Sequence, residues 1–210
     1  MSMKRTVFLA LSLCCFLISG LCLFSIKRAD DEALASRIAP EILRLHVLAN
    51  SDNHADQQLK IEVKSVLVDR ISRDMTSCSS KEEMCAYLTD NRDELESLAE
   101  SYIQTKGYSY PVSLKLTKDY FPAKTYGDMS FPCGTYDAAR FVIGKGKGHN
   151  WWCVLYPSLC FIDPTYATVP DSSKEKLKSA VDDKDFHALE SSKRPAPHIK
   201  FKILELFGRS

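Results

Sequence analysis

Cys153 and His149 are the first side chains in this sequence whose types and spacing suggest chemistry. A cysteine becomes a nucleophile when a nearby histidine or a helix N-terminus stabilises its thiolate. Cys153 lies within Trp-Trp-Cys-Val-Leu, which is typical of the middle of a β-strand. His149 lies four positions earlier, so we expect it to point along the same face without folding back onto the thiol. We keep a cell-wall thiol hydrolase that uses Cys153 as an alternative to a protein without catalytic activity. His46 is the only other histidine expected to reach the thiol.

A glycine-rich segment, Gly-Lys-Gly-Lys-Gly-His-Asn at residues 144–150, separates two runs rich in β-branched and aromatic residues. A nucleotide-binding loop needs a different order, either GxxxxGK followed by Ser or Thr, or GxGxxG between a strand and a helix. Alternate glycines instead suit the positive φ angles of a tight turn. The pattern predicts a β-hairpin with a long loop, formed by strands at residues 136–143 and 151–156, and no cofactor site.

The cysteines outside the N-terminal segment show no CxxC spacing, which argues against a structural zinc site: Cys78, Cys85, Cys133, Cys153 and Cys160. In one continuous helix, Cys78 and Cys85 would be separated by a rise of about 10.5 Å, beyond the limit of about 7 Å between the Cα atoms of a disulfide. Cys153 and Cys160 are also seven positions apart, but Pro157 lies between them and can turn the chain back. We therefore predict a Cys153–Cys160 disulfide in an oxidising compartment, with buried or free thiols as the open alternative.

The overall composition is that of a protein with a single core and no strong charge. Lys and Arg number 28 and Asp and Glu 27, giving a net charge of +1, so no global field attracts nucleic acid. The apolar fraction of 45% is enough for one core in 210 residues. No combination of acid, base and nucleophile stands out, and we expect neither a catalytic centre nor a metal, cofactor or small-molecule substrate.

The N-terminal segment differs in character from the rest of the chain. A basic pair at positions 4 and 5 precedes an apolar run at residues 7–26, which Lys27 and Arg28 close. A run of about 20 apolar residues is long enough to span a bilayer, and the positive start favours an N-terminus in the cytoplasm. Residues 1–28 are therefore predicted to be a signal peptide or membrane anchor, with the body of the protein outside the cytoplasm.

Residues 42–49 alternate between apolar and more polar side chains. Leu43 and Leu45 fall on one face of the expected strand, whereas Arg44 and His46 fall on the other. This alternation predicts a strand with one buried face and one face toward solvent.

The remaining periodicity predicts the fold class. Residues 57–75 carry apolar side chains at helical spacing, and a second helical region at 80–106 opens with a capping box and breaks near Asn91. A further alternating strand lies at residues 112–117. The order predicts an α+β fold, a two-layer domain whose mostly antiparallel sheet is covered on one face by two helices.

Domain organisation follows from these elements. We expect a polar stem at residues 29–41 and a core domain at 42–170. Residues 171–210 form a charged and Pro-rich tail, and its apolar end at 199–207 can return to the sheet as an edge strand.

Several blocks of the sequence resemble the stage II sporulation protein R family of endospore-forming bacteria. The most specific block is R-x-V-I-G-x-G-x-G-x-N-W-W-C-V-L at residues 140–155, because its tryptophan pair and cysteine are compositionally rare. Four shorter blocks also match: FP-x-K-T-Y-G at 121–127, P-x-G-x-Y at 132–136, P-x-L-C-F-x-D at 157–163 and, more weakly, R-L-H-V-L-A-N-S-D at 44–52.

The resemblance implies an exported signalling protein without catalytic activity. Members of the family are made in the forespore and exported into the intermembrane space toward the mother cell. There they trigger a membrane-embedded aspartic protease, which cleaves the precursor of the mother-cell transcription factor sigma E. The resemblance thus implies that protease as the partner, with the membrane as a second contact if the N-terminal segment is retained.

The strand at residues 151–156 is apolar on both faces, unlike a half-buried strand. Alternation places two sets of side chains on opposite sides: Trp151, Cys153 and Leu155 on one, Trp152, Val154 and Tyr156 on the other. One set can join the helix-covered core, while the other needs either the returning segments 159–162 and 199–207 or a partner protein as cover. Exposed tryptophan and tyrosine are typical of binding surfaces, so five residues are candidate partner contacts: Trp151, Trp152, His149, Asn150 and Tyr156.

Overall fold

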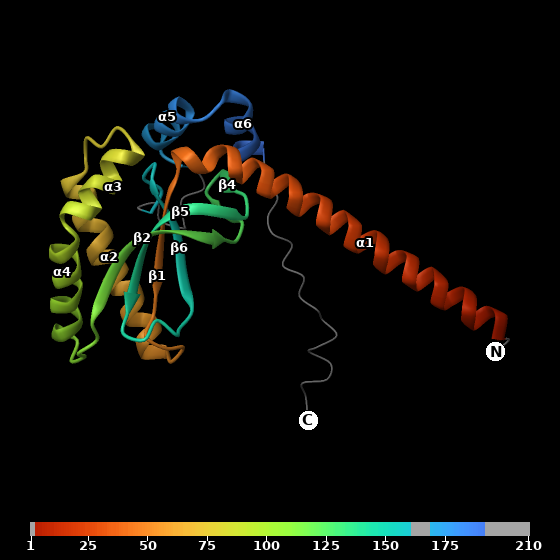
Figure 1. Cartoon of the computed structure of the whole chain (residues 1–210), viewed down its shortest axis with the longest axis horizontal. Helices are drawn as coiled ribbons and strands as arrows, with labels where there is room; N and C mark the ends of the chain where they lie inside the picture. Colours follow the sequence, from red (N-terminus) through yellow and green to blue (C-terminus); the bar gives the residue numbers. More distant parts are fainter. Residues whose placement is uncertain (1–2, 161–168, 192–210) are drawn as a thin grey trace.

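Four strands form the central sheet, in the spatial order β2-β5-β1-β6 (Figure 1). In the computed structural model, which describes residues 3–160 and 169–191, they are β1 (Leu43–Leu48), β2 (Val112–Phe121), β5 (Gly134–Ile143) and β6 (Asn150–Tyr156). β1 pairs with β5 in parallel and with β6 antiparallel, and β2 pairs antiparallel with β5. The sheet is therefore mixed, and the α+β class predicted from the sequence is confirmed.

The predicted β-hairpin between β5 and β6 is wrong, because β1 lies between these two strands. The glycine-rich loop that follows β5 crosses the end of β1 instead of turning directly back. The N–H of Gly148 holds it there by donating to the carbonyl oxygen of Ala49 at 2.9 Å. Gly144 and Gly146 do adopt the predicted turn conformation, with φ of +57° and +59°. Glycine spacing predicts the turns but carries no information on whether a third strand lies between the flanking two.

Three helices cover one face of the sheet: α2 (His54–Asp74), α3 (Lys81–Asp90) and α4 (Arg92–Thr105). The helix α3 begins at the predicted capping box, where the Ser80 side chain accepts a hydrogen bond from a backbone N–H one turn later, and Asn53 caps α2 in the same way. The predicted break at Asn91 separates α3 from α4. The apolar side chains of these helices pack with β1, β2 and β5 into the larger of two buried clusters.

The opposite face of the sheet is also covered. It lies against the C-terminal end of α1 (Met3–Ile38), the short ribbon of β3 (Lys124–Tyr126) and β4 (Met129–Phe131), and the helices α5 (Asp171–Ala180) and α6 (Asp183–Ser191). Arg44 and His46, on this face of β1, are only 0% and 6% exposed. The prediction of a solvent-facing side for this strand is therefore wrong, because segments assigned to the stem and the tail supply the cover.

The helix α1 carries the N-terminal apolar segment into the domain without interruption (Figure 1). Part of it is long and apolar enough to cross a membrane, and its apolar side chains project outward, with Phe16 77% exposed. This segment fits a signal or anchor. Its last turns belong instead to the second buried cluster, in which Ala35 and Ile38 are fully covered.

A short 3₁₀ turn, η1 (Ala39–Glu41), connects α1 to β1, so the predicted polar stem at residues 29–41 is helical and partly packed. The returning strand predicted at residues 199–207 lies outside the described residues, as do residues 161 and 162 of the predicted covering segment. The domain boundaries stay a prediction.

The contact between α1 and β5 generates the first testable prediction. A Cβ atom at Gly134 would lie 2.4 Å from the Cβ of Ala35, so Gly134→Ala should overpack the joint and lower the free energy of unfolding by about 1–3 kcal/mol. Adding Ala35→Gly removes the clashing atom and should restore part of that loss. Chemical denaturation in detergent of the unaltered chain, the two single variants and the double variant measures the coupling. Strictly additive effects would show that α1 does not dock against β5.

Candidate functional site at the tryptophan strand

The edge strand β6 presents its two tryptophans on opposite faces of the sheet. Trp151 pairs with Val47 of β1 and lies beside the helix-covered cluster, whereas Trp152 pairs with His46 and lies beside the second cluster. Both rings are half-buried. The position at a sheet edge leaves each ring with one side against the protein and part of its surface accessible.

Trp152 stacks on the imidazole of His46, with ring centroids 3.8 Å apart. The imidazole Nδ1 donates to Asp119 Oδ2 at 2.8 Å, and Asp119 also accepts a hydrogen bond from Arg140 Nε at 2.8 Å. The three polar residues come from three neighbouring strands, β1, β2 and β5. The guanidinium thus fixes the carboxylate, and the carboxylate fixes the imidazole beneath the indole.

The electrostatics of this group favour a charged Asp119. Burial by itself would raise the pKa of the carboxyl, but hydrogen bonds from Arg140 and His46 outweigh it and hold the pKa of Asp119 below its usual range. The second imidazole nitrogen, Nε2, is buried and has no hydrogen-bond partner among the described residues. The arrangement resembles the Asp–His pair that orients a general base.

A nucleophile within reach of that nitrogen would be needed for catalysis, and Cys153 does not supply one. Cys153 pairs with Leu45, and both belong to the helix-covered cluster, on the face of the sheet opposite His46. Its sulfur is also bonded to Cys160, so Cys153 has no free thiol. The hydrolase interpretation therefore lacks the contact between cysteine and histidine on which it depends.

Arg44 is the most unusual side chain near the site. It is 0% exposed, and none of its three guanidinium nitrogens has a hydrogen-bond partner among the described residues. Aromatic rings surround it instead, with the guanidinium carbon 4.4 Å from the Phe121 centroid and 5.0 Å from that of Tyr136. Burial lowers the pKa of Arg44 below its ordinary value, and the hydroxyls of Tyr126 and Tyr136 oppose that shift.

Phe121 links this arginine to the tryptophan. Its ring also meets Trp152 edge-on, with centroids 4.7 Å apart, and lies 6.1 Å from the imidazole of His46. Arg44, Asp119 and Arg140 were not singled out from the sequence as site residues. The available signal was Arg-x-His in an otherwise apolar strand, which predicted a solvent-facing side instead of a buried polar group.

Trp151 lies between two lysines. The ammonium nitrogens of Lys64 on α2 and Lys124 on β3 are 5.0 Å and 5.2 Å from its ring centroid. Burial lowers the pKa of both lysines. The indole N–H is itself buried, and no described residue accepts a hydrogen bond from it. This half of the site is therefore cationic, which is typical of surfaces that receive acidic groups.

His149 and Asn150 lie at the exposed end of β6, beside the glycine-rich loop. The backbone N–H of His149 donates to Asp52 Oδ1 at 2.6 Å, and its imidazole pairs with the same carboxylate. These hydrogen bonds hold the pKa of Asp52 below its usual range. The carbonyl oxygen of His149 accepts from the ammonium of Lys60 at 2.9 Å. The loop tip is thus tied to the start of α2.

Tyr156 does not share the surface of the tryptophans. It is 5% exposed, and its hydroxyl donates to the carbonyl oxygen of Ser79 at 2.6 Å. The register with β1 shifts here, so that Leu43 pairs with Tyr156 but Arg44 pairs with Val154. The predicted alternation of Trp152, Val154 and Tyr156 is wrong at its last member, because this irregularity turns Tyr156 toward the helix-covered cluster.

A disulfide closes the C-terminal end of β6. It joins Cys153 to Cys160, whose Cα atoms are 5.4 Å apart, and a hydrogen bond from Leu159 N–H to the Val154 carbonyl oxygen at 3.1 Å lies inside the same loop. Cys78, Cys85 and Cys133 carry free thiols. The bond fixes the chain where it leaves the sheet, immediately behind the tryptophans.

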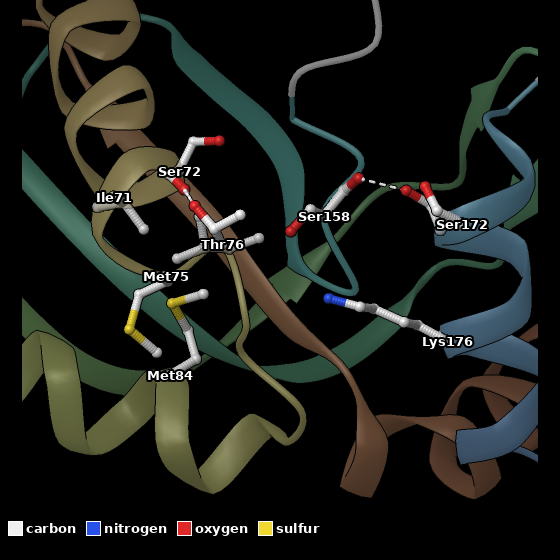
Figure 2. A pocket seen from close by; sticks show the side chains of 10 residues that line it. Ile71, Ser72, Met75, Thr76, Met84, Ser158, Ser172 and Lys176 are labelled. Carbon is white, nitrogen blue, oxygen red and sulfur yellow. Dashed lines mark hydrogen bonds between the residues drawn. The ribbon is translucent and has the colours of Figure 1, made fainter.

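A cavity of about 340 Å³ lies next to this end of the strand (Figure 2). Met75, Met84 and Leu155 form its apolar floor, while hydroxyls of α2 and α5 and the ammonium of Lys176 line its rim. Figure 2 shows Ser158 beside the start of α5, where the hydroxyl of Ser173 donates to the carbonyl oxygen of Ser158 at 3.0 Å. The ammonium of Lys176 donates to the carbonyl oxygen of Cys78 at 2.9 Å. The cavity contains neither tryptophan, and it separates α5 from the helix-covered layer.

These features define a class of protein, namely a small α+β domain that is continuous with an apolar N-terminal helix and carries an aromatic and cationic sheet edge. The chain belongs to the stage II sporulation protein R family, whose family model matches residues 39–166. It is 33% identical to the stage II sporulation protein R of Bacillus subtilis (strain 168) over 164 residues, which are 77% of this chain and 73% of that protein. No solved structure matches the chain. The family resemblance predicted from the sequence blocks is confirmed, and it supports a role in sporulation.

The depressed pKa of Asp119 predicts how stability depends on pH. The folded pKa lies below the unfolded value of about 3.9, so this group stabilises the fold above about pH 4 and loses that effect as pH falls through its folded pKa. Asp119→Asn should be less stable than the unaltered chain at pH 6 and should show a shallower loss toward pH 2. Thermal melting across this range measures both slopes, with the exposed Asp69→Asn as a control. Equal slopes for the unaltered chain and Asp119→Asn would contradict the assignment.

The disulfide predicts a pattern of thiol labelling. Alkylation of unreduced, unfolded protein followed by mass spectrometry should label Cys133 but leave Cys153 and Cys160 unlabelled. Replacing both bonded cysteines by serine should lower the free energy of unfolding by about 2–3 kcal/mol, the chain-entropy value for so short a loop. Labelling of both Cys153 and Cys160 without reductant would contradict the disulfide.

Proposed function

We propose that this protein is an exported sporulation signal that activates a membrane-embedded aspartic protease by direct contact. In this proposal the protein crosses the forespore membrane into the intermembrane space, and the activated protease processes the sigma-E precursor in the mother cell. Membership of the stage II sporulation protein R family is the single observation that carries the proposal.

The continuity of α1 with the domain supports an action at a membrane surface. A bilayer core is spanned by about 20 helical residues, and α1 has 36 residues. The remaining turns therefore extend beyond an apolar segment of that length and dock in the second buried cluster through Ala35 and Ile38. While the apolar segment is retained, this joint holds the domain at a fixed distance from the membrane, close to a membrane-embedded partner.

The contact surface we propose is the β6 edge of the sheet, with Trp152 at its centre, Trp151 on the other face of the same edge, and His149 and Asn150 at its end. Trp152 offers part of an indole whose other side is fixed by His46 and Phe121. A preorganised aromatic side chain loses little conformational entropy on binding, which is why tryptophan dominates many interfaces. Tyr156 is excluded from this surface by its burial.

The test is reconstitution in a host that does not sporulate. The chain is co-expressed with the protease and the sigma-E precursor, and cleavage of the precursor is followed by immunoblotting. The unaltered chain should trigger cleavage, and deletion of residues 7–26 should abolish it, because the domain then stays in the cytoplasm. Export itself is checked by fusing residues 1–40 to a reporter active only outside the cytoplasm. A silent reporter, or no cleavage with the unaltered chain, would overturn the proposal.

Trp152→Ala tests the contact surface within the same system. We expect at least a tenfold loss of cleavage. Because Trp152 also packs on His46, some stability should be lost, so Val154→Ala serves as the matched control. Val154 lies on the same face of the same strand and is 0% exposed. If both variants lose cleavage in proportion to their loss of thermal stability, Trp152 is a packing residue and not a contact.

A further inference from the structure

The second edge of the sheet is strand β2. Side chains of α4 accept hydrogen bonds from its outward backbone N–H groups along its first half only. The outward backbone N–H groups of Val112 and Leu114 donate to the carboxylates of Glu100 and Glu96 on α4, at 2.8 and 2.7 Å. Carboxylates that accept from edge N–H groups prevent another strand from pairing there. The first half of β2 is thereby closed to a further strand.

The outward N–H groups in the second half of the same edge have no such acceptors among the described residues. N–H groups alternate in direction along an antiparallel strand, so those of Leu116, Lys118 and Tyr120 point outward like those of Val112 and Leu114. No described residue accepts a hydrogen bond from these three groups. Leu116 and Tyr120 are also 36% and 46% exposed, which is unusual for large apolar side chains in this domain. The segment 116–120 is therefore an open and partly apolar sheet edge.

A cavity of about 300 Å³ opens beside this segment on the helix-covered face. Leu43, Cys85 and Leu116 form its apolar part, and Lys118 and Asp137 stand among its polar lining. A strand added to a sheet edge binds through its main chain and is selected by pockets for its alternate side chains. This cavity is the right kind of pocket for one apolar side chain of an added strand.

Charge distinguishes between possible occupants of the edge. Lys115 and Lys118 are exposed, and Lys118 makes only a distant pair with Asp137 at 3.6 Å. Asp119, the one acidic residue of the strand, is occupied by His46 and Arg140. A second copy of the chain pairing symmetrically about Lys118 would place two ammonium groups opposite each other, which destabilises a sheet. An acidic segment of another protein avoids that repulsion.

The end of β2 lies beside the helix α1, close to the end of its apolar segment. The hydroxyl of Tyr120 donates to Glu32 of α1 at 3.1 Å, and the guanidinium of Arg28 lies 5.7 Å from the Tyr120 ring. Arg28 follows the apolar run by two residues. The open edge thus begins beside the part of α1 that leaves the apolar segment, where a membrane-embedded partner has its external loops.

We propose that the segment 116–120 of β2 binds an extended, acidic segment of the partner as an added strand, with one apolar side chain of that segment in the cavity beside Leu116. This inference rests on the proposed function, because the partner is taken to be the membrane-embedded protease. It assigns a second contact on that partner, at the opposite edge of the sheet from Trp152.

The test uses the full chain in the reconstituted cleavage assay. Lys118→Pro removes the central outward N–H and leaves the N–H groups that face β5 intact, so an added strand cannot pair while the sheet remains. The double variant Lys115→Glu and Lys118→Glu reverses the charge without touching the backbone. We expect each to reduce cleavage at least tenfold. Lys178→Glu, an exposed charge reversal on α5, should have no effect, and thermal melting of each variant establishes that it is folded.

The outcomes separate this inference from the proposed function. No cleavage with the unaltered chain overturns both. If the unaltered chain triggers cleavage and a folded Lys118→Pro variant triggers it equally well, the added strand is overturned and the proposed function stands. If Lys118→Pro does not fold, the charge-reversal variant decides, and undiminished cleavage with that variant overturns the acidic partner segment.

Discussion

The burial of Arg44 among aromatic rings is the constraint on which the second buried cluster of this structure depends. Removing an ion from water costs several kcal/mol even in a relaxed protein interior, and each desolvated cation–π contact returns about 2 kcal/mol. Phe121, Tyr136 and Phe131 together can offset much of that cost. They do so only while water is excluded, and all three rings lie in the buried cluster that α1, α5, α6 and the β3–β4 ribbon help to form.

The second buried cluster connects the N-terminal helix α1 to the aromatic face of the sheet. The end of α1 belongs to the same buried cluster as the rings around Arg44, and Phe121 contacts both the guanidinium and the indole of Trp152. The indole in turn rests on an imidazole whose orientation is fixed by Asp119 and Arg140. Packed side chains thus connect the end of α1 to the tryptophan edge.

The two edges of the sheet differ in whether their outward backbone groups have hydrogen-bond partners. At β6 the outward carbonyl groups of Trp152 and Val154 accept hydrogen bonds from the Tyr126 hydroxyl and the Leu159 N–H, and the disulfide fixes the chain beside them. What remains accessible there is side-chain surface. At β2 the accessible feature is the main chain itself, beyond the reach of the α4 carboxylates. One edge thus suits aromatic contact and the other suits strand addition.

Local sequence determined α2, α3 and α4 with the cap at Ser80, the four strands of the central sheet, the apolar N-terminal segment and the family, because periodicity, capping and rare motifs act over a few residues. It did not predict β3, β4, α5 and α6, which are short. The candidate contacts Trp151, Trp152, His149 and Asn150 were visible for the same reason. Only the tertiary structure decided that β1 separates β5 from β6, that Arg44 and His46 are buried, and that Tyr156 turns inward at a register shift. Each of these depends on which distant segment covers a strand, and a polar side chain in an alternating strand has the same local pattern whether water or another helix lies above it.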